Sequence, residues 1–336
     1  MHNAAKKNIV AFSAVAMLIM VLDAKTVLSG AQCALDSCIH TVVPSLFPFI
    51  FMSSLIAGNM SGYSPKILRP IGRLCRIPQG TEMVLLLGFI GGYPLGAQMI
   101  SMAYKSGNLS RNTAHRMLGF CSNAGPAFIF GLIASKFHRN CIPWVIWLVH
   151  IVSSVITGIL LPRTEASVRV QTSGDQISLT RALHKSITAM AAICGWIILF
   201  RVLIAFLQSW CLWLLPTEIG VMSRGLLELT NGCLALDMLP NESIRFLFAN
   251  IMLSWGGLCV FMQTQHVTGG LGTGMYLRGK LLQSVCAFML SLLISPILFP
   301  GEIRYQQCII PLIIASLLAA AFQFRIPGKK TVAITM

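Results

Sequence analysis

The chain has 336 residues, of which 55% are hydrophobic and only 10% are charged. An ordinary soluble domain has roughly 25% charged residues, so this chain lacks the polar side chains that would cover a water-facing surface. The composition excludes a soluble enzyme, a secreted disulfide scaffold and a disordered regulator, and it predicts an integral membrane protein.

The basic residues and the cysteines fit the same class. The 25 Lys and Arg outnumber the 10 Asp and Glu, which gives a formal net charge of +15. In a soluble protein this excess would indicate nucleic-acid binding, but here the cations cluster in short segments between apolar runs, where they orient a membrane protein. The 11 cysteines lie mostly within apolar runs and show no metal-site spacing. We therefore expect no nucleic-acid partner, no metal and no cofactor.

Eight apolar runs are each close to the roughly 20 residues that cross about 30 Å of hydrocarbon. In chain order they span residues 9–22, 38–58, 115–135, 142–162, 187–213, 244–266, 279–299 and 305–324. We interpret the first run as an uncleaved helix rather than the core of a signal peptide, because so many membrane segments follow it. Residues 24–37 carry charges near both ends and are expected at the membrane interface.

Two further apolar segments cannot form uninterrupted helices. Segment 82–104 contains several glycines and Pro94 in its middle, and segment 222–239 contains Glu228 among other polar residues. Broken backbone at membrane depth survives only where protein or a water-filled cavity covers it. The predicted fold class is therefore an all-α polytopic membrane protein, with about eight transmembrane helices plus two re-entrant or broken helical hairpins.

The distribution of charge favours hairpins that leave the membrane on the side where they enter. With the N-terminus inside, this topology places 18 Lys and Arg on the cytosolic side and six outside, whereas full crossings would give 14 and 10. The positive-inside rule prefers the first arrangement, which makes both termini cytosolic. In this count Arg278 and Lys280 belong to a cytosolic loop, and Arg201 lies within the membrane.

The two halves of the chain show a weak internal similarity. Segment 38–58 corresponds to 187–213, segment 82–104 to 222–239, and the run 121–131 to 253–263. The first unit starts by crossing inward and the second by crossing outward, so the sequence predicts an inverted repeat. Many secondary transporters have this architecture, with a substrate site near the midplane at broken helices. Close packing of glycine-rich helices is the alternative explanation.

Four motifs carry a family resemblance: GFIGGYPLGAQM (88–99), CSNAGPAFIFG (121–131), ELTNG (228–232) and SWGGLCVFMQ (254–263). Together with VPSLFPF (43–49), the chain resembles the sporulation integral membrane protein family of YlbJ type, within the nucleoside-recognition (Gate) domain superfamily. The resemblance covers roughly residues 26–324. It implies an endospore-forming bacterium, expression during sporulation and a transporter-like membrane fold, and it supplies no substrate.

This resemblance and the repeat together give a domain organisation. We expect an N-terminal transmembrane helix and interfacial segment at 1–37, a first Gate-like repeat at 38–162, a cytosolic linker at 163–186, a second Gate-like repeat at 187–299, and a C-terminal helix with a basic tail at 300–336.

Glu228 is the strongest single candidate for a functional residue. An ionisable side chain at membrane depth is costly and marks a functional site by default. It could bind a coupling cation, take up a proton or accept hydrogen bonds from a solute. Alternatively, it could form a structural ion pair with Arg201, midway along 187–213. Glu228 and Arg201 are therefore the ion-coupling candidates.

Polar and helix-breaking residues at the matched breaks complete the predicted substrate site. Proline removes an N–H donor and disfavours helix before it, so nearby carbonyls can coordinate a ligand; capping of kinked helices is the alternative. The remaining predicted substrate-binding residues are Tyr93, Pro94, Ser122, Asn123, Gly125, Pro126, Thr230, Asn231, Ser254, Gly256, Gly257 and Gln263. His150 is expected to be neutral and hydrogen-bonded, with a proton relay as the alternative.

These features predict a sporulation-associated transporter or permease for a small polar solute, bound at the midplane between the two hairpins. The alternative function is a non-transporting membrane scaffold needed for assembly of the spore cortex or coat. No nucleophile–base pair or paired carboxylates indicate an enzyme. The expected partners are the solute and the lipid bilayer, with other sporulation membrane proteins or a second copy of the chain as further candidates.

Overall fold

The computed structural model describes residues 2–59, 65–164 and 177–324, and these ranges contain helices and turns but no strand. Five segments are long and apolar enough to cross a membrane. They are Ala24–Ile56, Ile142–Leu160, Leu179–Trp210, Glu242–Thr268 and Gly274–Leu298. The all-α class is confirmed for the described residues, and the five candidate spans support a membrane protein, whereas the count of eight crossings and the inverted repeat stay predictions. The basic tail from residue 325 and half of the predicted linker, residues 165–176, lie outside the described residues.

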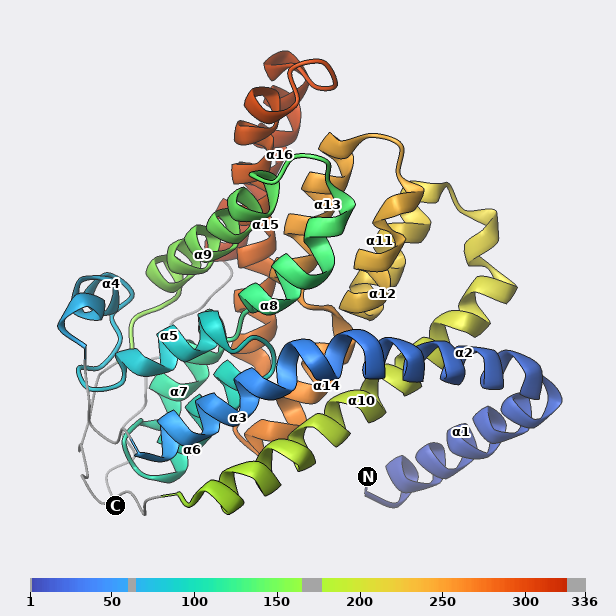
Figure 1. The fold of residues 1–336 in the computed structure, drawn as a ribbon, viewed down its shortest axis with the longest axis horizontal. Helices are drawn as coiled ribbons and strands as arrows, with labels where there is room; N and C mark the ends of the chain where they lie inside the picture. The colour runs from blue at the N-terminus through green and yellow to red at the C-terminus, as the bar shows by residue number, and fades with distance from the viewer. Residues whose placement is uncertain (1, 60–64, 165–176, 325–336) are drawn as a thin grey trace.

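The N-terminal part is a long helical arm. It contains α1 (His2–Leu22), α2 (Ala24–Ser37), the π-helical turn η1 (Cys38–Val42) and α3 (Val43–Asn59). The carboxylate of Asp23 begins α2 by accepting a hydrogen bond from the Thr26 N–H at 3.2 Å. From there α2, η1 and α3 run on as one helix, and both α2 and α3 pack along α10 (Figure 1). The predicted run 38–58 is thus the second part of a longer helical segment.

The first half then consists of short helices followed by one long helix. Its elements are η2 (Lys66–Leu68), α4 (Arg69–Leu74), α5 (Glu82–Ile90), α6 (Leu95–Lys105), α7 (Arg111–Leu118), α8 (Pro126–Phe128), η3 (Ile129–Ile133), η4 (Ala134–Lys136) and α9 (Ile142–Leu160). The predicted break in 82–104 is confirmed, because α5 ends at Ile90 and α6 starts at Leu95. The uninterrupted crossing predicted for 115–135 is wrong, since the helix stops at Leu118 and resumes at Pro126.

The second half has a similar order of elements. It contains α10 (Leu179–Trp210), η5 (Leu212–Leu214), α11 (Thr217–Leu227), α12 (Leu229–Leu234), η6 (Ala235–Met238), α13 (Glu242–Trp255), α14 (Gly257–Thr268), α15 (Gly274–Leu298) and α16 (Tyr305–Phe324). The predicted break in 222–239 is confirmed at Glu228, between α11 and α12. The apolar run 244–266 is also interrupted, because Gly256 adopts a positive φ of 83° between α13 and α14.

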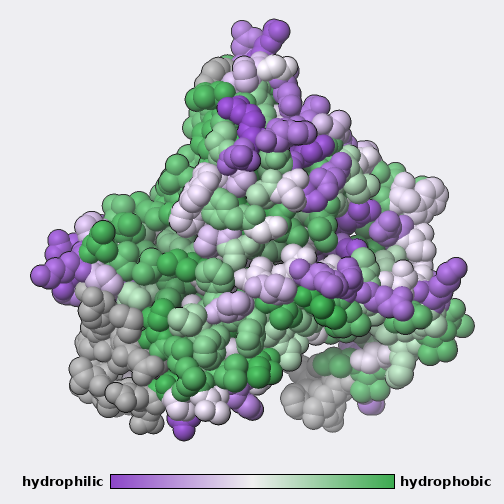
Figure 2. Space-filling view, in the orientation of Figure 1, coloured by the Kyte–Doolittle hydropathy of each residue, from purple (hydrophilic) through white to green (hydrophobic). Residues whose placement is uncertain are grey.

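The two halves pack into each other rather than standing apart. Helix α15 from the second half contacts α7 and α9 from the first, and α14 contacts α6. Figure 1 accordingly shows α15 running through the centre of the bundle. Large apolar side chains such as Phe12, Trp144 and Ile297 are exposed on the outside. Figure 2 shows apolar surface over much of the molecule, with polar side chains gathered near α4, along α2, and on the upper part around the α15–α16 loop and the start of α9. A surface of this kind suits a lipid environment.

Candidate functional site

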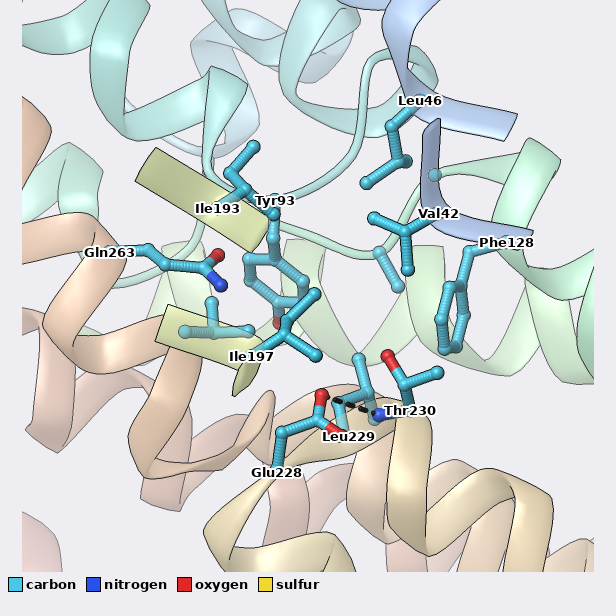
Figure 3. A pocket seen from close by; sticks show the side chains of 13 residues that line it. Val42, Leu46, Tyr93, Phe128, Ile193, Ile197, Glu228, Leu229, Thr230 and Gln263 are labelled. Carbon is cyan, nitrogen blue, oxygen red and sulfur yellow. Dashed lines mark hydrogen bonds between the residues drawn. The ribbon is translucent and has the colours of Figure 1, made fainter. Parts of the chain in front are cut away.

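A small cavity of about 40 Å³ lies where broken segments of both halves meet (Figure 3). Its polar lining residues are Glu228, Thr230 and Gln263 from the second half and Tyr93 from the first. The rest of the lining is Val42, Leu46, Ala124, Gly125, Phe128, Ile193, Ile197, Leu229 and Val260. Mostly apolar walls with a few converging polar groups are typical of small-molecule sites.

Glu228 lines this cavity and also lies at the break between α11 and α12. Its backbone is extended (φ −144°, ψ 120°), and its carboxylate begins α12 by accepting hydrogen bonds from the backbone N–H groups of Thr230 at 2.9 Å and Asn231 at 2.7 Å. The side chain is only 3% exposed. A carboxylate in this position satisfies two N–H groups that a helix start leaves without a partner. Each oxygen still has acceptor capacity for a ligand.

Arg201 lies away from the cavity lining. Its guanidinium Nη2 donates to the Cys33 Sγ on α2 at 2.9 Å, and within the described residues no ion pair joins it to Glu228. The Glu228 carboxylate is therefore held by backbone N–H groups, and not by the ion pair with Arg201 that was the alternative prediction from the sequence.

Tyr93 connects the first-half break to the second half. Its hydroxyl donates to the Leu253 carbonyl at 3.1 Å, near the end of α13. A side chain at Gly256 would place its Cβ 3.2 Å from the Tyr93 ring, so glycine is needed there both for this close approach and for the positive φ. In Figure 3 the ring stands at the centre of the cavity, with Gln263 and Phe128 on opposite sides and Glu228 and Thr230 below it.

The two breaks of the second half also contact each other. Gly257, with φ of 86°, lies so close to the α11–α12 junction that a Cβ would be 3.2 Å from both the Leu227 carbonyl oxygen and the Leu229 nitrogen. The start of α14 is therefore fixed against the segment that carries Glu228. Gln263, two turns along α14, consequently faces the same cavity.

Behind the cavity wall lies a buried polar network that the sequence predicted only in part. The amide of Asn123 donates to the Phe120 carbonyl at 2.7 Å and to the Ser154 hydroxyl at 3.2 Å. Its oxygen accepts hydrogen bonds from the Gln283 amide at 3.0 Å and from the Lys280 ammonium at 3.4 Å. Ser122, Asn123, Lys280 and Gln283 are all fully buried.

The placement of Lys280 corrects the sequence prediction. The charge count places Lys280 in a cytosolic loop, but the residue lies inside α15 and is 0% exposed. The charge count missed it because that count uses only distance from the ends of apolar runs. A usable signal was present, since Lys280 and Gln283 stand three residues apart and share one helix face in an otherwise apolar run.

His150, on α9, extends this network to Ala124 in the first half and to Ser254 in the second. Its Nε2 accepts a hydrogen bond from the Ala124 backbone N–H at 3.0 Å, and its Nδ1 lies 3.4 Å from the Ser254 hydroxyl. A nitrogen that accepts from a backbone N–H carries no proton, so the geometry is that of the neutral, hydrogen-bonded histidine expected from the sequence.

The predicted site residues therefore fall into three groups. Tyr93, Gly125, Glu228, Thr230 and Gln263 line the cavity; Ser122, Asn123 and Ser254 lie in the network behind it; and Pro94, Pro126, Asn231, Gly256 and Gly257 stand at the breaks that shape it. The structure thus brings residues from both predicted hairpins to one place.

Fold and site together define a helical membrane protein with a buried cavity between broken helices. The chain is similar to the sporulation integral membrane protein YlbJ of Bacillus subtilis (strain 168), with 33% identity over 103 residues. That match covers 30% of this chain and 25% of the relative, so it spans only about a quarter of that protein's length. No family model and no solved structure matches the chain. The similarity supports the sporulation membrane protein family, while membership of the nucleoside-recognition superfamily stays a prediction.

Proposed function

We propose that this chain is a sporulation-associated, multi-pass membrane protein that carries a small polar solute through the cavity above Glu228. The name of the similar Bacillus protein supports the sporulation role. Five apolar helices of sufficient length support the membrane location. The proposal includes cytosolic termini and an endospore-forming bacterium as the source.

The observation that carries the transport role is the meeting of broken helices at a buried carboxylate. Tyr93 and Gly125 reach the cavity from the first half, and Glu228 and Gln263 reach it from the second. Transporters bind their substrates at such breaks, near the midplane and between two repeats. A solute with hydroxyl or amine hydrogens could donate to Glu228 and contact the Tyr93 ring.

The order of elements supports the inverted repeat that this proposal requires. In each half a long helix (α3 or α10) is followed by two interrupted pairs and then a second long helix (α9 or α15). The interrupted pairs are α5–α6 and α7–α8 in the first half, and α11–α12 and α13–α14 in the second. We infer that residues 38–162 and 187–299 are the two repeats, with opposite orientations in the membrane.

The test is the thermal stability of the detergent-purified protein against a panel of nucleosides, amino sugars, dipicolinate, small dicarboxylates and amino acids. A solute at 100 times its dissociation constant adds about 2.7 kcal/mol of stability, which gives a measurable rise in melting temperature. The rise should be lost in Glu228→Gln and in Gln263→Leu.

Gln263→Leu is the cleaner of the two variants, because the Gln263 amide donates to the Cys259 Sγ on the same helix and Gln263, unlike Glu228, does not begin a helix. The matched control is Gln265→Leu, an exposed position on α14 outside the cavity lining, which should keep the solute response. A well-folded protein that responds to no solute would contradict the transport role and favour the membrane scaffold.

A further inference from the structure

Lys280 places an ammonium group deep inside the protein, within a segment long enough to span the membrane. Its Nζ donates to the Ser122 carbonyl, to Gln283 Oε1 at 2.7 Å and to Asn123 Oδ1 at 3.4 Å. The same nitrogen lies 5.0 Å from the centre of the Tyr93 ring. No carboxylate forms an ion pair with it among the described residues.

The surroundings of Lys280 are those of a cation site built from neutral ligands. An ammonium has three N–H donors, and three oxygens accept from this one. Carbonyl and amide oxygens replace the hydration shell of monovalent cations in membrane proteins, and an aromatic face adds further attraction. Because none of these ligands carries a charge, the site suits a cation of charge +1.

The oxygens are positioned by the backbone around them rather than by the lysine alone. A Cβ at Gly88 or Gly96 would lie 1.9 Å or 2.1 Å from the Cys121 carbonyl oxygen, and a Cβ at Gly279 would lie 2.2 Å from the Gly119 carbonyl oxygen. The segment between α7 and α8 is thus held between α5 and α6 on one side and α15 on the other. Removal of the lysine side chain should leave the oxygens in place.

This cation site shares a wall with the cavity. Tyr93 lines the cavity and also faces the ammonium, and Asn123 is followed directly by Ala124 and Gly125, which both line the cavity. A change at the ammonium therefore reaches the cavity through one aromatic ring and one short stretch of backbone.

We propose that Ser122, Asn123 and Gln283 form a monovalent-cation site that the chain fills permanently with its own Lys280 ammonium. Lys280 then supplies the positive charge to oxygens that the surrounding backbone already holds in place. The native protein accordingly requires neither sodium nor potassium for this purpose. The site exists whether or not the cavity carries a solute, so a failed solute screen leaves this proposal standing.

The experiment is the cation dependence of the Lys280→Ala variant. The purified variant is melted at equal ionic strength in choline, sodium, potassium or n-propylammonium chloride; n-propylammonium corresponds to the atoms that the substitution removes. At least one of the three smaller cations should raise the melting temperature of the variant above its value in choline by about 3 °C or more. The wild-type protein should melt at the same temperature in all four salts.

The matched control is Lys280→Met, which fills the space without a charge. It should be destabilised and should not respond to any cation. Equal melting of Lys280→Ala in all four salts would overturn the proposal, as would a Lys280→Met variant as stable as the wild type.

A second pair of variants covers the case in which Lys280→Ala does not fold. Gln283→Glu places a carboxylate 2.7 Å from the ammonium and should still accumulate in the membrane, because the charge pair offsets the loss of the amide hydrogen bond to Asn123 Oδ1. Gln283→Glu combined with Lys280→Met should accumulate far less than either single variant, because it buries a carboxylate with no cation. Equal accumulation of Gln283→Glu and the double variant would show that Lys280 carries no charge that the site needs.

Discussion

Replacing Glu228 by glutamine should lower the free energy of unfolding by about 1–3 kcal/mol, the range for leaving one buried donor without a partner. The wild-type carboxylate accepts two backbone hydrogen bonds, at 2.9 Å from Thr230 and 2.7 Å from Asn231. Glutamine keeps one acceptor oxygen and turns its NH₂ group toward the second N–H. One of the two bonds is lost, and two donors then face each other in a buried place.

The assay is equilibrium unfolding of the purified protein in mixed micelles with increasing SDS, followed by tryptophan fluorescence. The matched control is Glu218→Gln, an exposed acid in the first turn of α11, for which a change within about ±0.5 kcal/mol is expected. If Glu228→Gln unfolds at the same SDS fraction as Glu218→Gln, the carboxylate does not hold the start of α12. The structural account of the α11–α12 break would then be wrong.

Two further predictions test the packing of the halves and the topology. Gly279→Ala should destabilise the protein by about 3 kcal/mol, the upper end of the cost of overpacking a core, because the added Cβ would lie 2.2 Å from the Gly119 carbonyl oxygen. The control is Gly195→Ala, whose Cβ has no atom within 4 Å. It should be neutral or slightly stabilising in the same unfolding assay. The predicted topology places exposed Cys141, at the start of α9, outside the membrane. In a variant that lacks the other exposed cysteines, Cys33 and Cys211, a membrane-impermeant maleimide added to intact cells should label Cys141 and spare buried Cys121. Labelling of Cys141 only after permeabilisation would contradict the proposed orientation.

The sequence predicted those features that depend on local composition. The apolar content indicated the membrane class, and the glycines and Pro94 in 82–104 and Glu228 in 222–239 marked two real breaks. Glu228 was also correctly singled out as a buried acid, although its part in beginning α12 was not foreseen. That part depends on the extended backbone at residue 228, which hydropathy does not encode.

The features that the sequence missed depend on contacts between distant segments. The run 115–135 carries a helix breaker at Gly125-Pro126, but its helix already stops at Leu118, where Gly119 and Cys121 approach glycines from α5, α6 and α15. Lys280 was counted with loop cations because its acceptors, Ser122 and Asn123, are more than 150 residues away in the chain. A single sequence contains no signal for such pairings beyond the helical spacing of Lys280 and Gln283.

The length of α10 has a consequence for where the second half enters the bilayer. Its 32 residues extend about 48 Å at 1.5 Å per residue, whereas the hydrocarbon layer is about 30 Å thick. The first eight residues carry exposed Arg181, His184 and Lys185, and they account for about 12 Å. The remaining 36 Å or so of the helix can cross the bilayer with a moderate tilt. The first two turns of α10, which are polar, are therefore expected to project from the membrane into water.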